Sequence, residues 1–222
     1  MKARYQGPSV KFNYNTEKLI VVPMFIQDLT RCMINNKRFI IIPTQLVDEN
    51  YGHTNVVVID KLSKTIQRFD PHGSYLRYYI SDQLSFETNS SKMSKKFTDE
   101  LEDLFSQILP DYDFEDMDFI GPQHREKLVG WNWKKVGDSW TTSPGYCGIW
   151  TFWFIALRLQ FPNVPTKTLL DRAYRYLDRY GYSNFIEDFG YTVHLLGENL
   201  RVYLEQFPQD ERNHIIETLM HT

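Results

Sequence analysis

Two runs rich in β-branched residues, only four residues apart, constrain the fold of this chain most. The first run covers 54–60 and the second 65–70, with Lys61-Leu62-Ser63-Lys64 between them. Runs of this length and composition, joined by so short a connection, are typical of a β-hairpin. Because hairpin strands are antiparallel, the start of one strand lies beside the end of the other. We therefore expect an antiparallel unit whose open end brings residues near 53 and 70 together.

Strand-like segments are concentrated in the first half of the chain and helix-like segments in the second. Further strands are expected at 18–26, where Pro23 favours an edge position, at 38–47 and at 113–120. Helices are expected at 92–109, 146–160 and 166–180, the last capped by Thr166, and 161–222 reads as mostly helical. The polar stretch 87–91 reads as a surface loop. Segregated strands and helices predict an α+β fold with a small mixed or antiparallel sheet.

Composition excludes several classes of function. The formal net charge of −3 argues against nucleic-acid binding, which needs a basic face. No run approaches the roughly 20 apolar residues of a membrane span, and the first residues do not resemble a signal peptide. With only Cys32 and Cys147 present, no disulfide framework is implied. We expect a cytoplasmic protein in a reducing compartment, without a membrane partner.

Cys147 lies in Gly145-Tyr146-Cys147-Gly148, at the start of an apolar run that reads as a helix. A thiol at a helix N-terminus is favoured as thiolate, and the nearby backbone N–H groups can hold an oxyanion. The alternative is a buried cysteine that acts only as a small hydrophobic residue. The polar, glycine-containing approach favours a nucleophile near the surface.

His53 and Asp70 occupy the two ends that the predicted hairpin brings together. A carboxylate there can hold the imidazole in one tautomer, and the ring can then deprotonate Cys147. Each residue alone has an ordinary alternative, a surface histidine and a turn-forming aspartate. Together with Cys147 they supply the nucleophile, base and orienting group of covalent catalysis.

These motifs resemble the superfamily of ubiquitin-like-protein proteases and adenovirus proteases, especially versions encoded by large eukaryotic DNA viruses. The likeness rests on Gly52-His53-Thr54-Asn55, Val58-Ile59-Asp60, Arg68-Phe69-Asp70 and Gly145-Tyr146-Cys147. It covers roughly 38–160 and implies one cysteine-protease domain over 1–222, with 161–222 as a C-terminal helical part. The resemblance also implies that the helix bearing the catalytic cysteine packs against the sheet.

The family also carries a glutamine before the cysteine, whose amide donates to the oxyanion. The positions just upstream hold Thr141, Thr142 and Ser143, so Gln123 in Gly121-Pro122-Gln123 is the candidate. Its alternative is a solvent-facing residue at a helix start. The family's frequent Trp after the histidine is replaced by Thr54, which alters the expected groove.

The resemblance implies a protease that cleaves after small residues of the Gly-Gly type. Its protein substrates would be ubiquitin, a ubiquitin-like modifier or viral precursors, in the host cytoplasm or the virion. Two alternatives stay open: an acyltransferase with the same layout, and a non-catalytic ubiquitin-like-binding module. No cofactor is implied, and because His72 and His124 lack partners at metal-ligand spacing, we predict no zinc site.

Overall fold

The computed structural model describes residues 9–47, 52–73, 84–115, 121–123, 125, 134–136, 139–141 and 146–221. Its contacts divide the chain into two compact units, Met1–Tyr182 and Ser183–Thr222. The first unit contains all the described strands and the helices that pack on them, so the predicted α+β class is confirmed.

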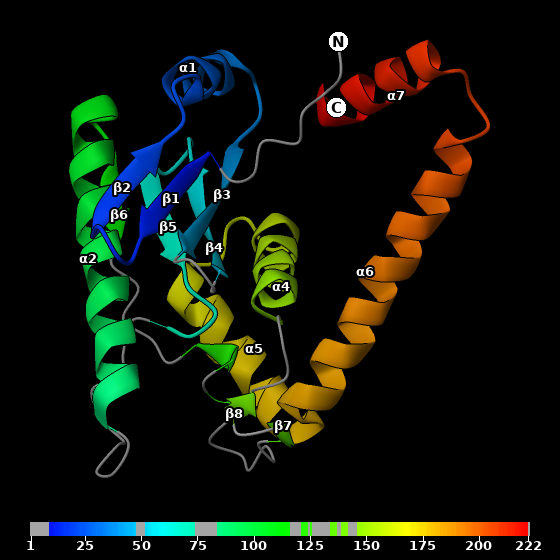
Figure 1. Ribbon diagram of the computed structural model, residues 1–222. Coiled ribbons are helices and arrows are strands. Elements are labelled where there is room, and N and C mark those ends of the chain that lie inside the picture. Colours follow the sequence, from blue (N-terminus) through cyan, green and yellow to red (C-terminus); the bar gives the residue numbers. More distant parts are fainter. Residues whose placement is uncertain are drawn as a thin grey trace. The chain divides into compact units, whose positions relative to one another are not determined.

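A six-stranded mixed sheet in the order β2-β1-β3-β4-β5-β6 forms the centre of the first unit (Figure 1). Its strands are β1 (Val10–Asn13), β2 (Lys18–Val21), β3 (Phe39–Val47), β4 (Gly52–Asp60), β5 (Thr65–Phe69) and β6 (Asp113–Glu115). Strands β3, β4 and β5 form an antiparallel meander, whereas β1 pairs with β3, and β6 with β5, in parallel. The predicted hairpin is therefore β4–β5.

The expected strand at 18–26 is wrong in its second half. Strand β2 ends at Val21, Pro23 lies in the turn that follows, and helix α1 (Phe25–Ile34) begins two residues later. Proline cannot donate to a strand ladder, which explains why pairing ends before it. The prediction of an edge is right for β2, which pairs only with β1 among the described strands.

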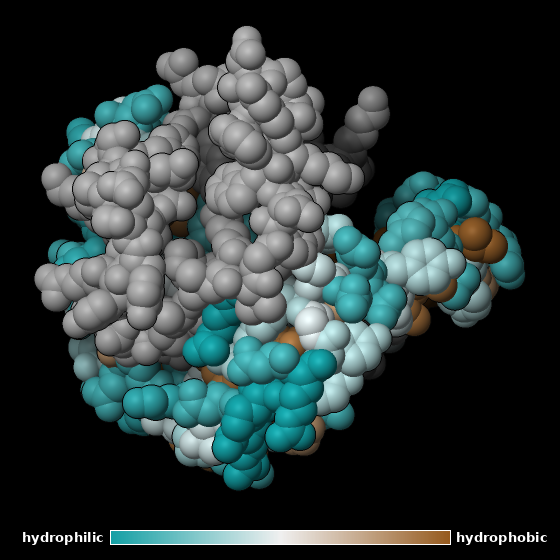
Figure 2. All heavy atoms as spheres, turned by 90° about the horizontal axis from the view of Figure 1, so that it is seen from below, coloured by the Kyte–Doolittle hydropathy of each residue, from teal (hydrophilic) through white to brown (hydrophobic). Residues whose placement is uncertain are grey.

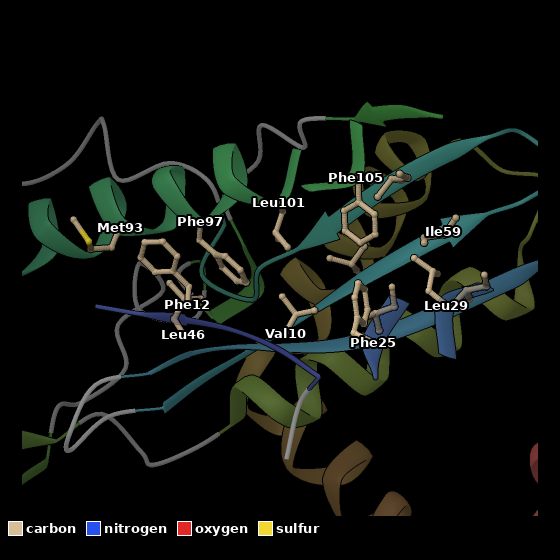
Figure 3. Packing of buried hydrophobic residues seen from close by; sticks show 14 residues of the cluster. Val10, Phe12, Phe25, Leu29, Leu46, Ile59, Met93, Phe97, Leu101 and Phe105 are labelled. Atoms are coloured by element: carbon tan, nitrogen blue, oxygen red, sulfur yellow. The ribbon is translucent and has the colours of Figure 1, made fainter. Parts of the chain in front are cut away.

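The main hydrophobic core lies between one face of the sheet and helices α1 and α2 (Leu84–Ile108) (Figure 3). Strand residues of this core include Phe12, Val57, Ile59 and Ile66. The helices contribute Phe25, Leu29, Met93, Phe97, Leu101 and Phe105. The loop predicted at 87–91 is instead part of α2. Its polar residues cost only tenths of a kcal/mol each in a helix, and the stretch contains no proline or glycine to stop it.

Helices α4 (Tyr146–Gln160) and α5 (Thr166–Tyr180) pack together within the first unit, and α4 meets the opposite face of the sheet. Phe69 of β5 stacks on Phe154 of α4 with ring centroids 4.2 Å apart, and Trp153 stacks on Tyr174 of α5. The expected cap at Thr166 is wrong, because the helix makes no side-chain cap there. The Thr166 hydroxyl donates to Gln67 Oε1 at 2.6 Å and so ties α5 to the sheet.

The remaining described elements are the short hairpin β7 (Lys134–Val136) and β8 (Ser139–Thr141), and the helices α6 (Tyr182–Leu204) and α7 (Gln209–His221). The prediction that the chain after 160 is mostly helical is confirmed. None of the described helices combines the length and apolar character needed to cross a bilayer. Seen from below, the described surface is mainly hydrophilic, with small hydrophobic spots (Figure 2).

Candidate active site

Strands β4 and β5 bring His53 and Asp70 together as the hairpin predicts. Val56 pairs with Phe69, so the chain just beyond β5 runs beside the first residues of β4. His53 is buried, and its Nε2 lies 2.7 Å from Asp70 Oδ1. Because Nε2 is taken by the carboxylate, Nδ1 is the ring nitrogen left to face another group.

Asp70 is held by donors on both carboxylate oxygens. Besides His53, the His72 backbone N–H donates to Oδ1 at 2.9 Å. Arg68 Nη2 and Ser94 Oγ each donate to Oδ2 at 2.8 Å. Burial by itself would raise the pKa of Asp70, but the charges of His53 and Arg68 and these hydrogen bonds hold it well below its usual range. The carboxylate is therefore ionised and fixed in direction.

Cys147 is the second residue of α4, as the sequence predicts, but it is buried and not near the surface as its polar approach led us to expect. Burial would raise the pKa of its thiol, but a hydrogen bond and the charge of His53, with the backbone and side chain of Thr54, lower it. Burial would likewise lower the pKa of His53, but Asp70 and then Cys147 outweigh it and raise that pKa to about 9. Both shifts favour the thiolate–imidazolium pair over the neutral thiol and imidazole.

Gln123 lies against the turn that follows Asp70. The Gln123 N–H donates to the Pro71 carbonyl at 2.9 Å, and the Gly121 N–H donates to the His72 carbonyl at 3.1 Å. The side-chain oxygen of Gln123 is buried and accepts no hydrogen bond from a described residue. The backbone of Gln123 therefore lies beside the turn 71–73 that follows Asp70, while its part in an oxyanion hole stays a prediction. Residues 142–145 and His124 lie outside the described residues.

Gly121 allows this close approach because it has no side chain. A Cβ at position 121 would come 2.2 Å from the Pro71 oxygen and 2.4 Å from the Gly73 nitrogen. Both neighbours are backbone atoms, so relief would require one of the two segments to move. The glycine thus determines how near Gln123 can come to Asp70.

His72 stacks on His53 with ring centroids 4.2 Å apart and planes 16° from parallel. The potential ligand atoms of His53, Asp70 and His72 lie within 4.8 Å of one another. Imidazole lone pairs lie in the ring plane, so two stacked rings do not direct them at one ion. Both oxygens of Asp70 also already accept hydrogen bonds. The geometry therefore fits proton transfer better than metal binding.

Sequence reasoning gave no role to several residues that build the site. Arg68 belongs to a motif of the sequence, and a charged residue inside a predicted strand, next to Phe69, is the signal that points to a buried and paired cation. Thr54 departs from the family pattern, yet its backbone and side chain help to lower the pKa of Cys147. Nothing in the sequence marked Ser94 as a residue of the site, because a serine on a polar helix face looks solvent-exposed until the tertiary structure places it.

Comparison with known proteins gives a distant viral relative. The chain is 23% identical over 205 residues to "Putative ankyrin repeat protein L371" of Acanthamoeba polyphaga mimivirus. The alignment covers 85% of this chain and 26% of that protein, so the chain spans about a quarter of the length of the relative it matches. No protein-family profile matches the chain, and no solved structure matches it.

Proposed function

We propose that this chain is a cysteine protease of the ubiquitin-like-protease type, with Cys147, His53 and Asp70 as its triad. The observation that carries the proposal is that Asp70 Oδ1 lies 2.7 Å from His53 Nε2, and that His53 and Cys147 are near enough for each to shift the pKa of the other. The placement of Cys147 at the start of a helix that meets the sheet accords with that fold type. Nothing in the name of the mimivirus relative concerns proteolysis, so the proposal rests on this geometry.

In the proposed mechanism the Cys147 thiolate attacks the scissile carbonyl carbon. The developing oxyanion is held by the Cys147 N–H, which lies in the first turn of α4 and has no intrahelical acceptor, and by the Gln123 amide. Imidazolium His53 then gives its proton to the leaving amine, and the C–N bond breaks to leave a thioester. Neutral His53 next takes a proton from water, whose hydroxide displaces Cys147 and releases the acid.

Asp70 keeps His53 in the required tautomer throughout and stabilises the imidazolium. The proposed substrates are proteins cleaved after small, Gly-Gly-type residues. Because the similar protein is viral, viral precursors stand beside ubiquitin and ubiquitin-like modifiers as substrates to test.

The test is labelling by ubiquitin and by ubiquitin-like modifiers that carry a C-terminal propargyl or vinyl electrophile. We expect one of these probes, or a peptide ending in Gly-Gly and an electrophile, to label the wild-type chain once. Labelling should disappear in Cys147→Ala and His53→Ala. The matched thiol control is Cys32→Ala, which removes the other free cysteine and should label normally.

Hydrolysis of a Gly-Gly-linked fluorogenic substrate by Cys147→Ala at the wild-type rate would overturn the proposal. Thioester formation followed by transfer to an added amine, with negligible hydrolysis, would instead identify an acyltransferase. Tight binding of a modifier without any covalent product would identify a binding module.

A further inference from the structure

Arg68 is a buried cation on the sheet, close to the candidate triad. Its side chain is only 4% exposed. Its neighbour Phe69 stacks on Phe154 of α4, and successive strand residues point to opposite faces. Arg68 therefore points away from α4 and toward α2, where its guanidinium lies 4.6 Å from the centre of the Phe97 ring.

The guanidinium binds acceptors on three separate elements. On the loop after β5, Nη2 donates to Asp70 Oδ2 at 2.8 Å. On β4, Nη2 and Nε donate to Asn55 Oδ1 at 2.6 and 3.1 Å. On α2, Nη1 donates to the Ser94 carbonyl at 2.8 Å and to Thr98 Oγ1 at 2.7 Å.

This arrangement connects both partners of the proposed acid–base pair. Asp70 Oδ2 is held directly, which leaves Oδ1 to face His53. Asn55 in turn donates from Nδ2 to the His53 carbonyl at 3.3 Å, so the same guanidinium also ties the backbone that carries the imidazole. Only a planar, multiply donating cation can serve acceptors in so many directions at once.

We infer that Arg68 is a positioning residue for the Asp70–His53 pair. The inference rests on the proposed function and deepens it. Arg68 acts through Asp70 and Asn55, the two acceptors that link its guanidinium to the ring and to the backbone of His53. Without it, Asp70 Oδ2 loses its charged donor and keeps the neutral donor Ser94 Oγ, so the carboxylate is held less firmly toward His53.

The inference is tested with Arg68→Met and Arg68→Lys in a Cys32→Ala background, so that iodoacetamide reports only on Cys147. Alkylation rate is measured against pH, and thermal unfolding is measured in parallel. The matched control is Arg38→Met, which breaks an Arg–Asp pair with Asp60 at the opposite end of β4.

We expect Arg68→Met to slow alkylation at neutral pH by about tenfold and to move the profile toward that of a free thiol. A peptidase assay should show a similar loss in kcat with KM little changed. Arg68→Lys keeps the charge but not the fork, so it should recover part of the loss. Arg38→Met should lose thermal stability and keep the wild-type pH profile.

If Arg68→Met fails to fold, Ser94→Ala gives a milder test, since it removes only the hydroxyl that donates to Asp70 Oδ2. It should shift the profile in the same direction by a smaller amount. The inference would be overturned if Arg68→Met lowers thermal stability and leaves the pH profile of alkylation unchanged. The same result in both Arg68→Lys and Ser94→Ala would also overturn it. If His53→Ala leaves the pH profile of alkylation as it is in the wild type, the proposed triad itself is refuted. That is a separate outcome.

Discussion

Replacing Asp70 by asparagine should collapse the thiolate–imidazolium pair without changing the shape of the side chain. The carboxylate of Asp70 supplies the largest of the interactions that raise the pKa of His53. With an uncharged amide in its place, burial dominates and disfavours the imidazolium. His53 then becomes neutral, and Cys147 loses the cation that favours its thiolate.

The size of the effect follows from the pKa of His53, which stands at about 9 against an ordinary value of 6.5. A tenfold change in a protonation equilibrium is about 1.4 kcal/mol, so the surroundings favour the imidazolium by about 3 kcal/mol. If the pKa falls to the ordinary value or below, the protonated fraction of His53 at about pH 7.5 drops from nearly all to roughly a tenth or less.

Iodoacetamide alkylation of Cys147, measured across neutral pH in a Cys32→Ala background, should therefore be about tenfold slower in Asp70→Asn. The control is Asp60→Asn, which neutralises another buried aspartate with an arginine partner, far from Cys147 along β4. An Asp70→Asn profile that superimposes on those of the wild type and Asp60→Asn would refute the reasoning, because His53 would then not owe its charge to Asp70.

Three other outcomes are expected. Gly121→Ala should lower kcat and thermal stability together through the backbone clash described above, whereas Gly197→Ala, with open space around it inside α6, should keep kcat and raise rather than lower thermal stability. Gln123→Ala should lower kcat by on the order of 10²–10³ with KM little changed, and an unaltered kcat would assign the oxyanion to backbone N–H groups. Because the pKa of His53 is raised to about 9, its stabilising effect is complete below pH 6.5 and lost as pH rises through 9. The loss of thermal stability in His53→Gln should thus shrink from pH 6 to pH 10, and His194→Gln serves as the exposed surface control.

Local pattern predicted the β4–β5 hairpin, the helix that starts at Tyr146 and the helical C-terminal part. Local pattern predicted the structure less well where the hydrogen-bond partners of polar residues lie far away in the sequence. The stretch 87–91 was expected to be a loop, because serine, threonine and asparagine disfavour helices. Thr166 was expected to cap its own helix but binds Gln67, a residue 99 positions away in sequence. Such long-range partners leave no trace in the spacing of a single sequence.

The sequence alone determined that His53 and Asp70 meet, because hairpin geometry links the two positions through backbone hydrogen bonds between neighbouring strands. It also determined that Cys147 begins a helix, since the apolar run starts there. Only the tertiary structure decided that this helix lies against β4 near His53, and that α2 brings Ser94 to the far side of Asp70. Those placements depend on how side chains of distant segments fill one core and satisfy each other's buried polar groups. The charge state of the site is a property of that packing.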